Sequence, residues 1–243
     1  MITKVLSVGG SIIAPDAPDA KFLSEFSAMV TDWLHSKKDA RLILVAGGGG
    51  PARTYQNAYR DVAKSFTAQQ KKSASFADEA ATNNACDWLG IMATRLNAQL
   101  LKTVFGPLCE QDVIYNPTQV GDFTGRILVA AGWKPGFSTD NDAVLLAERF
   151  NADTVVNLSN IEKVYTDDPR KNPNAKPLDD ISWADFRKMV GDEWVPGKNC
   201  PFDPIASKKA SELKLTVICA GGKNISNIRA ILDGKDYIGT TIK

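Results

Sequence analysis

Glycine-rich or turn-rich segments recur along this sequence, each after a short apolar run and before a stretch of helical spacing. They are Gly9-Gly10-Ser11, residues 47–50, residues 132–139 and Gly221-Gly222. Glycine lets the backbone approach a phosphate closely, and the free N–H groups at the next helix start favour an anion. One glycine turn at a strand end is a common structural device. Several on one edge of a sheet predict a ligand, or a pair of ligands, rich in phosphate.

Known phosphate motifs account for these turns poorly. No segment fits the Walker loop G-x-x-x-x-G-K-[ST]. The run Gly47-x-Gly49-x-x-Ala52 matches the loose dinucleotide pattern, which also needs an acidic residue about 20 positions on, at a strand end. The segment near Thr67 is polar and not strand-like, so the sequence argues against a dinucleotide site.

The loop of residues 133–140 combines several groups that could serve phosphate chemistry. Ser138 and Thr139 can cap the next helix and donate hydroxyl hydrogen bonds to an anion, although capping alone explains them equally well. Asp140 stands where a carboxylate could position magnesium or a catalytic lysine. Asp87 opens another predicted helix, where it would either complement the helix dipole or accept hydrogen bonds from ribose hydroxyls.

Strands and helices alternate over nearly the whole chain, which predicts βαβ units and a mostly parallel sheet in a single domain, residues 1–243. In a parallel sheet the glycine-rich junctions share the carboxyl edge, where such sheets bind ligands. Residues 66–82 are predicted to be a mobile surface connection, and residues 164–176 an irregular excursion. The predicted strands are 5–8, 42–46, 112–115, 127–131, 153–158, 215–220 and 237–242. The predicted helices are 19–35, with Asp19 as N-cap, 51–64, 87–102, 140–150, 203–213 and 225–232.

The composition of the chain excludes several classes of function. With 243 residues, 44% of them hydrophobic, the chain can bury a sizeable core, and its formal charge of +1 gives no general reason to bind nucleic acid or an acidic membrane. No secretory signal or membrane span is evident. The four cysteines are widely spaced, which indicates free thiols in a reducing cytoplasm. A single histidine, His35, argues against a zinc site or a His-based triad.

Taken in order, the motifs resemble the amino acid kinase superfamily, and within it the archaeal-type branch of UMP (uridylate) kinases. The resemblance runs from Val5 to Ile242. The matching segments are Val8-Gly9-Gly10-Ser11, Gly47-Gly48-Gly49 with Ala52-Arg53, Asp87-Trp88-Leu89-Gly90-Ile91 with Thr94-Arg95 and Asn97-Ala98, Pro135-Gly136 with Ser138-Thr139-Asp140, Val164-Tyr165-Thr166 with Asp168-Pro169, Asp203-Pro204, and Gly239-Thr240-Thr241-Ile242.

The resemblance implies a three-layer α/β/α sandwich that transfers the ATP γ-phosphoryl group to UMP with magnesium, the acceptor on the N-terminal half and ATP on the C-terminal half. The ATP contacts it implies are Gly10, Ser11, Gly49, Arg53, Ser159, Tyr165 and Asp168. The UMP contacts it implies are Gly48, Asp87, Trp133, Lys134, Pro135, Gly136, Phe137, Ser138 and Thr139. Asp140 and Asp203 would organise magnesium and the transferring group without a direct protein cage. Lys208 is a candidate to reach the phosphates, although a solvated lysine explains it equally well.

Some positions depart from the family pattern. A lysine common in the superfamily is Ser7 here, another is Gly50, and Glu162-Lys163 replaces an Asp-Gly pair. These changes leave two alternatives open: another acceptor, such as carbamate, acetylglutamate, aspartate or isopentenyl phosphate, or a non-catalytic relative that binds nucleotide or another anion. Kinases of this branch are commonly hexamers, so the resemblance implies a homo-oligomer acting on small molecules.

Overall fold

The molecule is built on a seven-stranded sheet, seen in a computed structural model that describes residues 2–67, 70, 78–193 and 200–243. In chain order the strands of this sheet are β1 (Ile2–Val8), β2 (Ala40–Ala46), β3 (Ile127–Ala130), β4 (Thr154–Ser159), β7 (Asp180–Ile181), β8 (Thr216–Gly221) and β9 (Thr240–Ile242). The spatial order is β3-β2-β1-β4-β8-β9-β7, and only the β8–β9 pairing is antiparallel among these described strands. The predicted mostly parallel sheet is confirmed.

The central strands are buried on both faces, so they read as continuous apolar runs rather than as alternating patterns. Successive residues nevertheless point to opposite sides. Leu6 and Leu44 belong to one hydrophobic core, whereas Val5 and Ile43 belong to the other, and all four are fully buried. The sheet therefore separates two cores, each of which a helix layer must cover.

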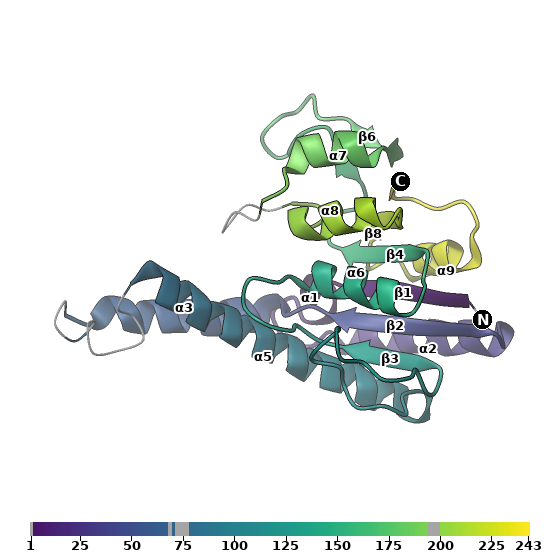
Figure 1. Ribbon diagram of the computed structural model, residues 1–243, viewed down its shortest axis with the longest axis horizontal. Helices are drawn as coiled ribbons and strands as arrows, with labels where there is room; N and C mark the ends of the chain where they lie inside the picture. The colour runs from purple at the N-terminus through teal and green to yellow at the C-terminus, as the bar shows by residue number, and fades with distance from the viewer. Residues whose placement is uncertain (1, 68–69, 71–77, 194–199) are drawn as a thin grey trace.

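Two helix layers cover the sheet and complete an α/β/α sandwich (Figure 1). One face packs against α2 (Ala20–Ser36), α5 (Glu79–Phe105) and α9 (Ile225–Asp233), and the opposite face against α6 (Thr139–Arg149), α7 (Trp183–Val190) and α8 (Pro204–Glu212). The short α1 (Gly10–Ile13) and the long α3 (Gly49–Ser65) start at glycine turns. Helix α3 lies along α5, and the two project beyond the sheet (Figure 1).

The glycine turns that the sequence singled out lie along one rim of the sheet. Because β1, β2, β3, β4 and β8 are parallel, their carboxyl ends share an edge, and Gly10, Gly48 and Gly136 each follow one of these ends. Had these turns fallen on opposite sides of the molecule, no phosphoryl group could pass between ligands bound there. The predicted common edge is confirmed.

Some predicted elements are wrong in position. The predicted strand 112–115 contributes only one isolated bridge, Ile114 to Ala130. The last strand spans Thr240–Ile242 rather than 237–242. Helix α5 begins at Glu79, capped by Asp78, so Asp87 lies in the helix interior and its charge does not complement the N-terminal dipole.

Other segments had no counterpart in the sequence prediction. Helix α7, capped by Ser182, and a small antiparallel sheet of β5 (Val164–Tyr165) and β6 (Pro177–Leu178) were not anticipated. A 3-10 turn, η1 (Gly106–Leu108), follows α5. Most of the predicted connection 66–82 lies outside the described residues; of its described part, residues 79–82 are helical.

Candidate active site

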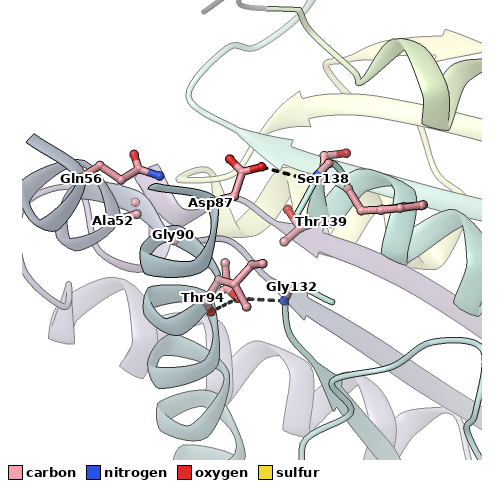
Figure 2. A pocket seen from close by; sticks show the side chains of 13 residues that line it. Ala52, Gln56, Asp87, Gly90, Thr94, Gly132, Ser138 and Thr139 are labelled. Atoms are coloured by element: carbon pink, nitrogen blue, oxygen red, sulfur yellow. Dashed lines mark hydrogen bonds between the residues drawn. The ribbon is translucent and has the colours of Figure 1, made fainter. Parts of the chain in front are cut away.

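A cavity of about 300 Å³ opens at the rim, between the ends of β2 and β3 on one side and α3 and α5 on the other (Figure 2). Its lining residues are Gly48, Gly49, Ala52, Gln56, Asp87, Gly90, Ile91, Thr94, Gly132, Gly136, Phe137, Ser138 and Thr139. A cavity of this size with a few convergent polar groups is the usual form of a small-molecule site. The sequence had assigned six of these residues to the acceptor: Gly48, Asp87, Gly136, Phe137, Ser138 and Thr139.

One face of α5 forms the wall of this cavity. Asp87, Gly90, Ile91 and Thr94 line it, and their spacing of three and four residues places them on one side of a helix. The Asp87 carboxylate (Oδ2) accepts a hydrogen bond of 3.1 Å from the backbone N–H of Gly136 (Figure 2). Asp87 therefore ties α5 to the middle of the 132–138 loop, and it lines the cavity beside it.

Thr94 holds the start of the same loop. Its hydroxyl accepts a 2.8 Å hydrogen bond from the N–H of Gly132 and donates a 2.6 Å bond to the carbonyl of Ile91. A Cβ atom on Gly132 would lie 3.0 Å from that hydroxyl oxygen, so the close approach favours glycine. Thr94 matches the family pattern, but the sequence alone assigns it no role because its partner Gly132 is 38 residues away.

Three further α3 and α5 side chains with no assigned role hold the walls together. Asn97 is buried, and its amide donates to the carbonyls of Gly47 at 2.7 Å and Gly48 at 3.2 Å. Arg95 donates to the carbonyl of Trp133 at 3.2 Å. On α3, the Gln56 amide donates to the Cys86 carbonyl at 2.9 Å and lines the cavity (Figure 2). Helix α5 thus fixes the 47–48 turn and the 132–138 loop at once.

The loop also carries two aromatic rings under a cation. The rings of Trp133 and Phe137 lie 5.0 Å apart, and Lys134 Nζ lies 4.0 Å from the first ring centre and 4.8 Å from the second. Phe137 lines the cavity, whereas Trp133, Lys134 and Pro135 are not among its lining residues. The predicted contacts from Trp133 to Thr139 therefore follow one another in one segment, but only Gly136 to Thr139 line the cavity.

The first two glycine turns touch each other. A Cβ on Gly10 would lie 2.0 Å from the backbone nitrogen of Gly49, and a Cβ on Gly47 would lie 2.3 Å from that of Gly10. Gly49 also has a φ of 67°, which other residues rarely adopt. These glycines are required by contact between the two loops, in addition to any approach of a phosphate.

Asp140 lies where the two halves of the rim meet. Its Oδ1 accepts from the Ser7 hydroxyl at 3.1 Å, and its Oδ2 accepts from the backbone N–H of Asp203 at 3.2 Å. Burial, and to a lesser extent the nearby charge of Asp203, raises the pKa of Asp140 to about 6, although these two hydrogen bonds oppose the shift. The contact explains the departure at position 7, because a buried serine replaces a lysine and bonds the carboxylate.

Comparison with known proteins agrees with this geometry. Residues 3–221 match the amino acid kinase family. The chain belongs to that family. It is 34% identical to a uridylate kinase of Methanospirillum hungatei over all of this chain and 95% of that protein, and 33% identical to one of Pyrococcus abyssi over 98% of both. The crystal structure of uridylate kinase from Archaeoglobus fulgidus superposes with a TM-score of 0.77 at 27% identity, covering both chains completely.

The residues predicted to contact ATP fall into two groups. Gly10, Ser11 and Gly49 lie at the touching turns of β1 and β2, and Arg53 lies in the first turns of α3, where it donates to the Pro15 carbonyl at 3.0 Å. The structure brings these four residues together at the rim. A Cβ on Gly50 would lie 2.2 Å from the Pro15 carbonyl oxygen, so the lysine common at this position does not fit this backbone.

The second group lies farther along the rim, at β4 and the β5–β6 hairpin. Ser159 ends β4 and accepts from the N–H of Ile161 at 3.3 Å, and Tyr165 belongs to β5. The Asp168 carboxylate accepts from Arg170 Nε and Nη2, each at 3.0 Å, which lowers its pKa. An ion pair to Arg170 was not anticipated. Their assignment to ATP remains a prediction.

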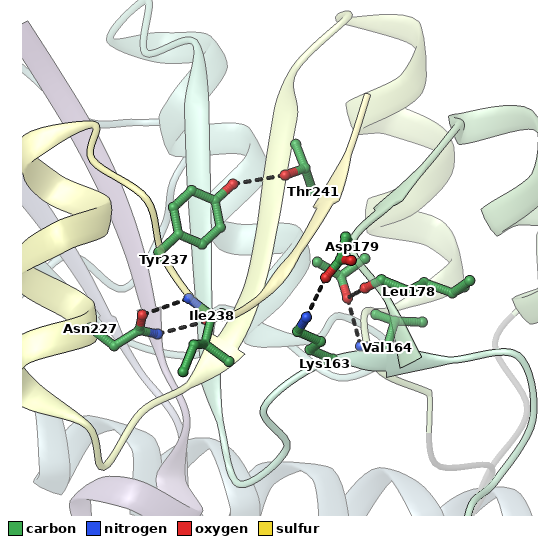
Figure 3. Close-up of polar contacts among 9 residues, drawn as sticks. Lys163, Val164, Leu178, Asp179, Asn227, Tyr237, Ile238 and Thr241 are labelled. Carbon is green, nitrogen blue, oxygen red and sulfur yellow. Dashed lines mark hydrogen bonds and ion pairs between the residues drawn. The ribbon is translucent and has the colours of Figure 1, made fainter. Parts of the chain in front are cut away.

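Side-chain hydrogen bonds attach this hairpin to the end of the sheet (Figure 3). The Val164 N–H donates to the Thr240 hydroxyl at 2.8 Å, and that hydroxyl donates to the Leu178 carbonyl at 2.5 Å. Lys163 pairs with Asp179 (Figure 3). Lys163, which departs from the family pattern, therefore forms an ion pair with Asp179 that helps to hold the hairpin.

The remaining predicted catalytic residues lie on α8. Asp203 is buried and caps the helix by accepting from the N–H of Ala206 at 2.8 Å. Lys208 lies on the same helix and is exposed. No group of three or more potential metal-ligating side chains occurs within the described residues. No helix in the described part of the chain is long and apolar enough to cross a membrane.

Proposed function

We propose that this chain is an ATP-dependent uridylate kinase that converts UMP and ATP into UDP and ADP. The observation that carries the proposal is the meeting of the Asp87 carboxylate and the 132–138 loop in one cavity, next to the rim where Asp140 contacts Ser7 and Asp203. The names of the archaeal relatives support UMP as the acceptor. The reaction forms a bond from a UMP phosphate oxygen to the γ-phosphorus and breaks the bond to the ADP oxygen.

The geometry suits a reaction that needs positioning more than covalent help. In this proposal the acceptor lies in the cavity, with its ribose hydroxyls donating to Asp87 and its base against Phe137. The donor phosphates lie over Gly10, Ser11, Gly49 and Arg53, and its nucleoside lies toward Ser159, Tyr165 and Asp168. The N-terminal half would then bind the acceptor and the C-terminal half ATP.

Magnesium fits the proposed arrangement as an ion carried by the nucleotide. Magnesium is commonly held by one or two carboxylates together with substrate phosphates and waters, rather than by a dedicated protein cage. Asp140 and Asp203 are the carboxylates that would hold it, because the Asp203 backbone N–H contacts the Asp140 carboxylate and the charge of Asp203 acts on Asp140. The ion would neutralise charge on the transferring group, and Lys208 would reach the same phosphates.

We propose a cytoplasmic enzyme, and the free thiols of Cys86, Cys109 and Cys219 support this setting. We also propose a homo-oligomer, with a hexamer as the expected form. Its partners would be the small-molecule substrates UMP and ATP, and neither nucleic acid nor membranes. Sedimentation of the purified protein would measure the assembly directly.

A screen of nucleoside monophosphates with ATP and magnesium tests the activity. We expect UMP to be the preferred acceptor. Asp87→Ala should raise the Michaelis constant for UMP by about tenfold or more, since it removes a charged hydrogen-bond acceptor from the cavity, while the constant for ATP changes little. If carbamate, acetylglutamate, aspartate or isopentenyl phosphate is phosphorylated in preference to UMP, that compound is the acceptor instead. ATP binding without transfer to any acceptor would show that the chain is a non-catalytic relative.

A further inference from the structure

A second carboxylate in the first turn of α6, Asp142, has no place in the activity described so far. Its exposed fraction is 0%, and its Oδ2 accepts a 3.1 Å hydrogen bond from the backbone N–H of Trp133. Its Oδ1 is buried and has no hydrogen-bond partner within the described part of the chain. Ser138 already caps α6 through the Asn141 N–H, so Asp142 is not needed as a helix cap.

The 132–138 loop is closed onto α6 at both of its ends. Asp142 accepts from Trp133 at the start of the loop, and its own backbone N–H donates to the Ser138 carbonyl at 3.1 Å at the other end. Asp87 on α5 holds Gly136, between these two points. Of these three contacts, only the one at the Trp133 N–H is made by a buried side chain of α6.

Burying a carboxyl group at this position carries a cost that ordinary packing would avoid. A buried polar atom without a partner destabilises the folded state, and burial here raises the pKa of Asp142 to about 7. The neighbouring helix positions Ala143, Val144 and Leu146 are buried and apolar. A residue needed for packing alone would resemble them, so the carboxyl group is better explained by its bond to the loop.

We propose that Asp142 is a positioning residue for the acceptor. It holds the start of the 132–138 loop against the first turn of α6, at a fixed place relative to Asp140. The turn that carries Asp142 also carries Asp140, whose contacts with Ser7 and Asp203 place it at the centre of the rim. Asp142 thereby sets the position of the cavity wall relative to the site of transfer. This inference rests on the proposed uridylate kinase activity.

Two variants of Asp142 and a matched control test the role. Asp142→Ala removes the acceptor of the Trp133 N–H. Asp142→Asn keeps a carbonyl oxygen for it and resembles the protonated acid. Ser182→Ala removes the cap of α7, which contributes no residue to the cavity, and shows what a loss of stability alone does. For each variant, melting temperature, the Michaelis constants for UMP and ATP, and UMP affinity by calorimetry are measured.

We expect Asp142→Ala to weaken UMP binding and raise the Michaelis constant for UMP by about tenfold, which corresponds to one hydrogen bond of about 1.4 kcal/mol. The constant for ATP should stay within about twofold, and Asp142→Asn should recover most of the loss. Equal changes for both substrates, no change, or an Asn variant as impaired as the Ala variant would overturn the inference. Wild-type protein that neither binds nor phosphorylates UMP would instead overturn the proposed function, and the inference with it.

Discussion

Thr94→Val replaces the hydroxyl that joins α5 to the 132–138 loop by a methyl group of similar size. Two hydrogen bonds are affected, but they differ in consequence. The Ile91 carbonyl accepts from the hydroxyl at 2.6 Å and remains available for bonds within the helix backbone. The Gly132 N–H donates to it at 2.8 Å and is buried, so the valine variant leaves that donor without a partner.

The expected cost follows from that single buried donor. Leaving a buried N–H unsatisfied costs about 1–3 kcal/mol, and no cavity term is added because valine fills the same volume. We therefore expect the free energy of unfolding to fall by about 2 kcal/mol, which lowers the melting temperature of a domain this size by roughly 4–8 °C. Because Gly132 begins the loop, the Michaelis constant for UMP should rise severalfold.

Chemical denaturation in urea measures the free energy, and initial rates at varied UMP concentration measure the Michaelis constant. Thr94→Ser is the matched control, because it keeps the hydroxyl and loses the methyl group instead. We expect the serine variant to retain the wild-type constant for UMP. If Thr94→Val is as stable as the wild type to within about 0.5 kcal/mol, or if serine impairs UMP binding as strongly as valine, the hydroxyl does not hold the loop.

Two other predictions concern the turns and the buried carboxyl groups. Gly10→Ala places a Cβ 2.0 Å from the Gly49 backbone nitrogen, so it should lower the melting temperature and the activity sharply. Gly121→Ala is the control, because its Cβ meets no atom within 4 Å, and it should change neither quantity. Equal effects of the two variants would contradict the contact between the turns. Asp142 has a folded pKa of about 7, above the unfolded value near 3.9, so its contribution to the free energy of unfolding is greatest at low pH and falls as pH rises toward about 7. Urea unfolding across this range should show a smaller fall in Asp142→Asn, and identical profiles would refute the assignment.

The sheet and the common rim could be predicted because they depend on local patterns. Val5 to Val8, interrupted only by Ser7, and Leu42 to Ala46 are short apolar runs followed by glycine. Such runs between helical segments indicate parallel strands with both faces covered. Parallel strands necessarily bring their carboxyl ends to one edge. The gathering of Gly10, Gly48 and Gly136 at that edge follows from this reasoning, whereas the place of Asp87 beside them was implied by the family resemblance.

The start of α5 could not be read from apolar periodicity. Its first turns carry few large apolar residues, because this part of the helix extends beyond the sheet with α3 and has no core to cover (Figure 1). The α5 residues that pack into the core beside the sheet come later in the helix, at Ala98, Leu101 and Phe105. The predicted helix therefore begins at Asp87, where the helix dipole is one of two explanations for the charge, beside hydrogen bonds from ribose hydroxyls.

The tertiary hydrogen bonds of the site were also beyond the sequence. Thr94, Asn97 and Asp142 bond backbone groups of segments 38, up to 50, and 9 residues away, and nothing in their local pattern identifies those partners. The contact between Gly10 and Gly49 depends on β1 lying next to β2, which only the order of the sheet reveals. Sequence reasoning located the loops, and the structure shows what fixes each of them.

The contact between the turns at Gly10 and Gly49 limits where the enzyme can open. Backbone atoms press against each other there with no side chain between them, so these two turns must shift as a single rigid piece. Any movement that admits substrates or releases products therefore has to shift other parts of the rim relative to that piece.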